Sequence, residues 1–145
     1  DKAAVEKCFE AGEGASLEIT IGGTWDKING KKISCSVKVL KLVENYGVYN
    51  SRLALVEMGD IRIVLTSNHI GFGDEELLPA LDVKAEDYCI VIVKLGYLEP
   101  CFQKIAKRAI LAESKGCSNE VLETLDYPQT PRPIYPLDKD MDIKL

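Results

Sequence analysis

Prolines near the end of the chain restrict its folding more than any other sequence feature. Four of the six prolines fall within the twelve residues 127–138. Each proline fixes its own φ near about −65° and lacks a backbone N–H, and each biases the preceding residue towards an extended conformation. Neither a helix nor a central strand can form there. The segment is therefore either a loose polyproline-like tail or a strap that follows one fixed path across a folded body.

Large apolar side chains between these prolines favour the strap. Disordered tails are usually poor in such residues, whereas this segment contains Ile134, Tyr135 and Leu137. We therefore predict a Pro-rich strap and tail over residues 127–145, with Arg132, Tyr135 and Asp138 as its structural residues. The Arg132 guanidinium can bind a carboxylate with two parallel hydrogen bonds. Fastening the strap is its simpler use, and binding a ligand carboxylate is the alternative.

The size and charge of the chain narrow the classes of function. Its 145 residues are enough for a single domain, 1–145, with a genuine core. The net charge of −5 argues against a nucleic-acid surface, which needs clustered basic residues. No apolar run approaches the roughly 18 residues of a membrane-spanning helix. We expect no nucleic-acid partner and no membrane partner.

The cysteines indicate a reducing compartment. There are five of them, and no Cys-x-x-Cys pattern typical of a zinc knuckle is present. Cys35 and Cys89 lie in apolar stretches, where a thiol behaves as a small core residue. We therefore expect reduced thiols and a cytoplasmic protein, with a disulfide framework as the alternative.

The first half of the chain predicts an antiparallel meander. Asp1 is suited to begin a helix that Gly12 ends. Four stretches then show strand character, either by alternating apolar and polar residues or by their apolar content, and turns of a few residues join most of them. They are residues 17–21, 35–42, 48–58 and 61–66.

The second half predicts a different arrangement. Cys89–Val93 is an unbroken apolar run, which is typical of a strand buried on both faces. A helix over 99–106 and a strand over 106–113 would complete one right-handed βαβ crossover. Short helices are also expected after Asp74 and over 119–125. We therefore predict an α+β fold: a mixed, largely antiparallel sheet of five to seven strands, with helices mainly on one face.

Candidate metal ligands are scarce. A hydrolytic zinc ion normally has three protein ligands, commonly including two or more histidines, and His69 is the single histidine. Asp138, Asp140 and Asp142 alternate as in half of a calcium-binding EF-hand loop, but the glycine and the distal glutamate of that loop are missing. We expect no metal ligands in this chain and interpret the aspartates as an acidic tail.

The run Ser67, Asn68, His69 contains a nucleophile and a base, but neighbours on an extended chain point to opposite faces. A hydrolase that uses Ser67 or a cysteine is therefore the weakest interpretation, and a turn with a surface histidine is the simplest. Lys94 follows the predicted buried strand, at the edge where ligand crevices form in open sheets.

Gly96 permits close backbone approach, and Tyr97 adds a phenol near Lys94. Together Lys94 and Tyr97 can hold a carboxylate, either of a peptide or of a partner domain. The alternative is a lysine that closes the sheet edge with a tyrosine packed beside it.

Several motifs resemble those of a known family in order and spacing. The sequence is similar, from Asp1 to Asp138, to the C-terminal domain of microcystinase C-like (MlrC-like) proteins, the M81-family metallopeptidases. The residues that carry the resemblance are Arg132–Asp138 (Arg-Pro-Ile-Tyr-Pro-Leu-Asp), Val93–Leu98 with Ile105–Ala112, Ala11–Ala15 leading to Ile21–Gly23 and Asn29–Gly30, and Ile63–Ser67.

The resemblance implies that this chain is a fragment of a longer one. In MlrC-like proteins the metal ligands lie in a larger N-terminal domain, which has no counterpart here. The chain would then be a non-catalytic, cofactor-free domain of a zinc metallopeptidase, with zinc in the absent domain and peptide-bond hydrolysis as the parent reaction. It would shape the active-site cleft and pack on the metal domain, and it allows a homodimer.

The candidate cleft residues are Lys94, Gly96, Tyr97, Ser67, Asn68 and His69. Many relatives have a Lys-Ser type block with a downstream His and Phe instead. This chain departs from that form, so no histidine role is transferred to it. The alternative function is a stand-alone binding or oligomerisation module without enzymatic activity, in which edge strands such as 17–21 pair between chains.

Overall fold

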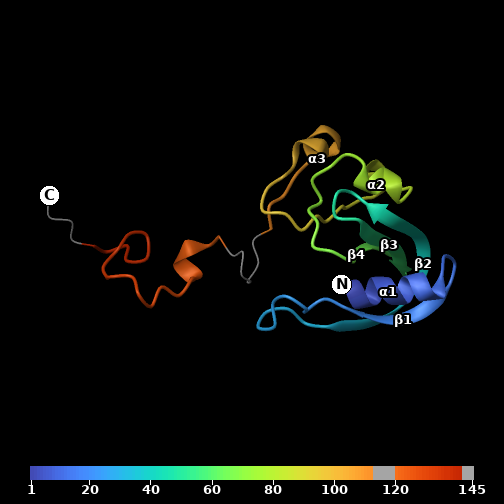
Figure 1. The fold of residues 1–145 in the computed structure, drawn as a ribbon. Helices are drawn as coiled ribbons and strands as arrows, with labels where there is room; N and C mark the ends of the chain where they lie inside the picture. The colour runs from blue at the N-terminus through green and yellow to red at the C-terminus, as the bar shows by residue number, and fades with distance from the viewer. Residues whose placement is uncertain (113–119, 142–145) are drawn as a thin grey trace. The chain divides into compact units, whose positions relative to one another are not determined.

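The computed structural model describes residues 1–112 and 120–141. The chain divides into two compact units, Asp1–Ile110 and Leu111–Leu145. The larger unit contains the sheet and the candidate site residues predicted between Ser67 and Tyr97. Figure 1 shows the course of the chain.

The described residues form one sheet of four strands in the order β1-β2-β3-β4. Each strand pairs antiparallel with its sequence neighbour, so the predicted meander is confirmed. Turns at Gly47 and Gly59, both with positive φ, join β2 to β3 and β3 to β4, a conformation that glycine adopts without steric cost. The strands are β1 (Ser16–Ile21), β2 (Ile33–Tyr46), β3 (Ser51–Met58) and β4 (Ile61–Thr66).

Helix α1 (Lys2–Ala11) covers one face of the sheet. Gly12 follows the helix with a φ of 84°, and the helix ends there as the sequence predicts. The buried residues of the helix are Ala4, Val5 and Cys8. These three pack against side chains from all four strands, namely Ile19, Cys35, Val37, Val39, Ala54, Val56 and Leu65. Removing such side chains from water contributes roughly 1.5–3 kcal/mol for each large one.

The opposite face is covered by helix α2 (Leu77–Ala80) and the chain around it. Leu77 and Leu81 pack on Leu53 and Leu55 of β3. Because Ala54 and Val56 alternate with these leucines, β3 is buried on both faces. The expectation of helices mainly on one face is therefore wrong, since α1 and α2 lie on opposite sides of the sheet (Figure 1).

A hydrogen-bonded carboxylate fixes α2 to the sheet. Asp74 accepts hydrogen bonds from the backbone N–H groups of Glu76 (3.1 Å) and Leu77 (2.8 Å), which confirms a helix after Asp74. It also accepts one from the Tyr46 hydroxyl at the end of β2. Burial, together with the bond to Asp74, raises the pKa of Tyr46 well above its ordinary value.

The prediction of further strands in the second half of the chain is wrong. Helix α3 (Pro100–Ile105) forms where a helix was expected, but no strand forms in residues 89–93 or in the described part of 106–113. Ile90 and Ile92 are 77% and 91% exposed. The described chain therefore has four strands rather than five to seven, and no βαβ crossover. An apolar run favours burial, but a strand also needs a neighbour to receive its hydrogen bonds, and the meander supplies none to this segment.

Two short 3₁₀ turns complete the described structure: η1 (Ala85–Asp87) and η2 (Leu122–Thr124). The turn η2 lies within the helix predicted over 119–125, whose first residue is outside the described residues. No helix in the described parts of the chain has the length and apolar content that crossing a membrane requires.

In the C-terminal unit, the proline-rich segment is closed on itself. The Arg132 Nε donates to a carboxylate oxygen of Asp138 at 2.6 Å, and Nη2 donates to the other oxygen. The Ile134 N–H also donates to Asp138 at 2.7 Å, and the Asp138 N–H returns a bond to the Ile134 carbonyl at 2.9 Å. Arg132 thus uses its two-pronged geometry within the segment.

Substituting Leu53 tests the burial of β3 on both faces. Leu53 is 0% exposed, so Leu53→Ala should lower the free energy of unfolding by about 2–5 kcal/mol. Ile92→Ala is the control, because a 91% exposed side chain should change it by no more than about 0.5 kcal/mol. Denaturant unfolding measures both. Equal losses would show that residues 89–93 are buried after all.

The Asp138 contact predicts a specific acid titration. The hydrogen bond from Arg132, followed by that from the Ile134 N–H, lowers the pKa of Asp138 from 3.8 to about 2. Because this pKa is depressed, the contact is fully formed above pH 3.8 and is lost as the pH falls through about 2. Carboxyl NMR shifts should show this, and Arg132→Ala should return the pKa towards 3.8. An unaltered protein in which Asp138 titrates near 3.8 would contradict the contact.

Candidate functional site

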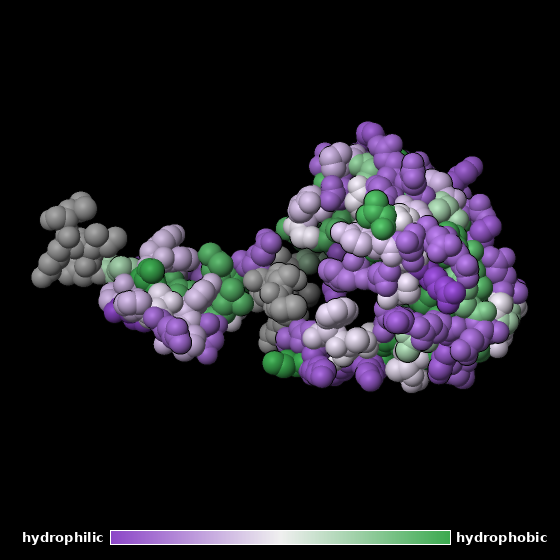
Figure 2. Space-filling model, viewed as in Figure 1, coloured by the Kyte–Doolittle hydropathy of each residue, from purple (hydrophilic) through white to green (hydrophobic). Residues whose placement is uncertain are grey.

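Three of the predicted site residues line one hollow, which we call the Trp25 hollow. The segment that follows β4 contributes Ser67, Asn68 and His69. A cavity with a volume of about 380 Å³ lies beside these residues. In the space-filling view the larger unit is hollowed above the loop that joins β1 to β2 (Figure 2). The complete lining is Asp1, Lys2, Ala3, Thr24, Trp25, Thr66, Ser67, Asn68, His69 and Ile70.

The loop between β1 and β2 forms one wall of the hollow, and its shape is held by Asp26. The Asp26 carboxylate accepts hydrogen bonds from the backbone N–H of Ile28 (2.9 Å) and of Asn29 (2.8 Å), and from the Asn29 side-chain amide (3.0 Å). Gly30 passes so close that an added Cβ would lie 2.4 Å from the Asp26 carbonyl oxygen. This loop therefore has little freedom to change its path.

Trp25 projects from this loop onto His69. The ring centroids are 5.7 Å apart and the ring planes are inclined by 59°, within the range of tilted aromatic contacts. Trp25 nevertheless remains 79% exposed. A large part of the indole is free to contact another molecule.

The hydroxyl and amide groups of the hollow are engaged within the protein. The Ser67 hydroxyl accepts a hydrogen bond from the Arg52 N–H at 2.9 Å. The Thr66 hydroxyl donates to the Asn68 carbonyl, and the Asn68 amide donates to the Tyr49 carbonyl, both at 2.9 Å. In this part of the described structure no hydrogen bond joins Ser67 to His69. The arrangement therefore lacks the nucleophile–base contact of a hydrolase triad.

The other predicted residues, Lys94, Gly96 and Tyr97, do not line the Trp25 hollow. The expectation that Lys94 ends a buried strand is wrong, because no strand precedes it. Tyr97 is 68% exposed, and a hydrogen bond to Glu99 raises the pKa of Tyr97. The pKa of Asp26 is lowered, first by its bonds from Asn29 and to a smaller extent by the charge of Lys94. Lys94 is therefore within electrostatic reach of the Trp25 loop.

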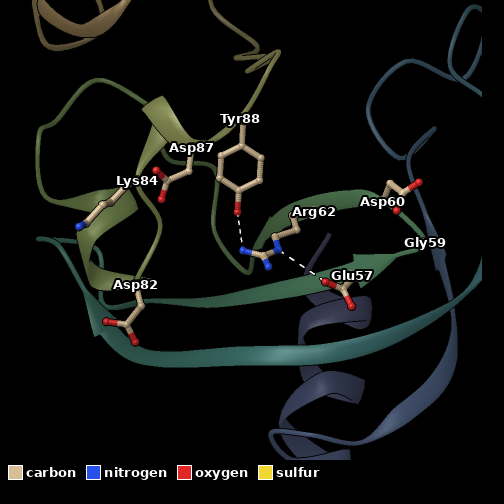
Figure 3. A pocket seen from close by; sticks show the side chains of 8 residues that line it. All are labelled: Glu57, Gly59, Asp60, Arg62, Asp82, Lys84, Asp87 and Tyr88. Carbon is tan, nitrogen blue, oxygen red and sulfur yellow. Dashed lines mark hydrogen bonds and ion pairs between the residues drawn. The ribbon is translucent and has the colours of Figure 1, made fainter.

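A second hollow, shown in Figure 3, is not predicted by the sequence. Its cavity volume is about 440 Å³. Arg62 of β4 donates to the Tyr88 hydroxyl at 2.6 Å and pairs with Glu57 of β3 at 3.5 Å. No sequence motif joins these residues, because Arg62 and Tyr88 are 26 positions apart. The remaining lining residues are Gly59, Asp60, Asp82, Lys84 and Asp87.

Neither hollow contains an evident metal site. Within residues 1–112 and 120–141, no group of three or more His, Cys, Asp or Glu side chains is arranged to hold a metal ion. The charges of the second hollow are partly paired, since Arg62 binds Glu57 and Asp82 binds Lys41 at 2.8 Å. The Trp25 hollow is the better candidate site, because it combines an exposed aromatic ring with the predicted residues.

Comparison with known protein families supports the resemblance that the sequence motifs indicate. A family model described as the MlrC C-terminus matches residues 1–129. The chain belongs to the MlrC C-terminal domain family. The resemblance is thereby confirmed for most of the chain, although the match ends before Arg132–Asp138. No curated protein and no solved structure matches this MlrC C-terminal domain.

The contact between Trp25 and His69 can be followed in this MlrC C-terminal domain by fluorescence. Each is the single residue of its type. The His69 ring packs on the Trp25 indole, with the ring centroids 5.7 Å apart. His69→Gln should therefore shift the Trp25 emission maximum, because the indole loses an aromatic neighbour. An emission spectrum that is unchanged in this variant would show that the rings are apart in solution.

Proposed function

We propose that this chain is the non-catalytic C-terminal domain of an MlrC-like zinc metallopeptidase. The zinc ion would be held by an N-terminal domain of the same polypeptide, and the reaction would be hydrolysis of peptide bonds. In this proposal the present domain shapes the active-site cleft and packs on the metal domain. Membership of the MlrC C-terminal family supports it.

An exposed apolar segment is the observation that carries the proposal. Cys89–Val93 has the composition of a buried strand, yet Ile90, Val91 and Ile92 are 77%, 42% and 91% exposed. Ile110, also in the larger unit, is 77% exposed. Contiguous exposed apolar residues mark surfaces that contact another protein body. We assign this segment to the contact with the metal domain.

The Trp25 hollow is the part of the domain that we assign to the cleft. It combines Ser67, Asn68 and His69 with an exposed indole, and a second domain that closes a cleft excludes water and orients the substrate. The described cysteines, Cys8, Cys35, Cys89 and Cys101, all carry free thiols. Free thiols fit a cytoplasmic location, which forms part of the proposal.

Metal analysis tests the assignment of the zinc site. The present chain should contain only background zinc, whereas the longer polypeptide with its metal domain should contain about one ion per chain. Peptide hydrolysis should occur only in the longer protein and should be lost with a chelator. One tightly held zinc ion per copy of the present chain would contradict the proposal.

The packing role is tested by Ile92→Ser. In the present chain this exposed substitution should change the stability by no more than about 0.5 kcal/mol. In the longer protein it should lower the thermal midpoint, because a buried apolar contact is lost. Ile61→Ser, at a 56% exposed position of β4, is the matched control. Equal effects of Ile92→Ser in both proteins would argue against a contact with the metal domain.

A stand-alone binding or oligomerisation module is the alternative function. The position of β1 at the edge of the sheet favours it, because an edge strand can pair with a second copy. Sedimentation velocity over a range of concentrations separates the two. A stable dimer of the present chain, with no metal domain encoded before it, would favour the alternative.

A further inference from the structure

We propose that the Trp25 hollow is a binding site for one apolar side chain of a peptide, with aromatic side chains preferred. That the side chain belongs to a peptide rests on the proposed function. That the hollow receives an apolar group rests on its own geometry.

Few hydrogen-bonding groups of the lining remain to meet a ligand. The Thr66 and Ser67 hydroxyls and the Asn68 amide are hydrogen-bonded within the protein. The Thr24 hydroxyl donates to the Asp1 carboxylate at 3.2 Å. The parts of the lining left for contact are the Trp25 and His69 rings and the apolar side chains Ala3 and Ile70. Such a surface favours apolar and aromatic groups.

Both walls of the hollow are preorganised. The Trp25 loop is held by three hydrogen bonds to the Asp26 carboxylate and by the close passage of Gly30. The opposite wall is held to β3 by the bond from the Arg52 N–H to Ser67. Walls that are already ordered lose little conformational freedom on binding. The cavity volume of about 380 Å³ also lies within the usual range of small-molecule sites.

The charged groups at the rim of the hollow are paired within the protein. Two charged side chains lie at the rim, and each has a partner: Asp1 accepts from the Gly22 N–H at 2.9 Å, and Lys2 pairs with Glu6 at 3.8 Å. The Asp1 α-ammonium donates to the Thr66 carbonyl at 3.0 Å, so each of these charged groups already has a partner within the protein. An apolar side chain therefore binds in preference to an acidic or a basic one.

Titration of Trp25 fluorescence with N-acetyl amino-acid amides tests the site. The phenylalanine and leucine amides should give saturable changes, with a Kd of about 1 mM for phenylalanine, as expected for one side chain in an open hollow. The serine and aspartate amides should bind at least about tenfold more weakly. The absence of a saturable change, or equal binding of all four amides, would overturn the proposal.

Variants locate the binding. Trp25→Ala should weaken binding of the phenylalanine amide at least about tenfold, measured by ligand-observed NMR because the fluorophore is lost. Ile28→Ala is the matched control, since this residue is on the same loop and 93% exposed but does not line the hollow. The control should leave the affinity unchanged. Equal affinity of the Trp25→Ala and unaltered proteins would place binding elsewhere.

Repeating the titration with the longer polypeptide identifies the natural occupant. Binding to both proteins supports a peptide substrate. Binding to the present chain alone would show that a side chain of the metal domain fills the hollow, and it would overturn the substrate assignment. These results are independent of the zinc analysis, so a failure of the binding site is distinguishable from a failure of the proposed function.

Discussion

The burial of β3 on both faces is the interaction on which the rest of this structure depends. Its alternate residues enter two separate apolar clusters, one beneath α1 and one beneath α2. Side chains of a strand point alternately to the two faces, so a single eight-residue strand joins both clusters. The sheet is consequently a rigid support, and the segments that leave its edges are held in place by it.

The Trp25 hollow illustrates how the sheet positions the side chains of a candidate site. Ser67 follows β4 and receives a hydrogen bond from Arg52 of β3, so β3 holds one wall of the hollow in place. The opposite wall is a loop whose path is determined locally by Asp26 and Gly30. A hollow with one wall anchored in the core and one stabilised by its own hydrogen bonds is formed before any ligand arrives.

The exposed Cys89–Val93 segment lacks the support that the sheet gives to the Trp25 hollow. Its residues favour a strand, but the described structure offers them neither a hydrogen-bonding neighbour nor an apolar cover. In the proposed metallopeptidase the metal domain would supply that cover. The Trp25 hollow and this segment would then serve different purposes: the hollow would face the cleft, and the segment would form the domain contact.

The local parts of this fold were determined by the sequence alone. The four strands between residues 17 and 66, the helix that Gly12 ends and the helix after Asp74 follow from the apolar pattern and from interactions between near neighbours in the chain. The motifs of the sequence also carry the resemblance to the MlrC family. Only the tertiary structure decided that Cys89–Val93 has no strand partner and that Trp25 meets His69. Both depend on which distant segments come together, and hydrophobic periodicity has no information about pairing partners.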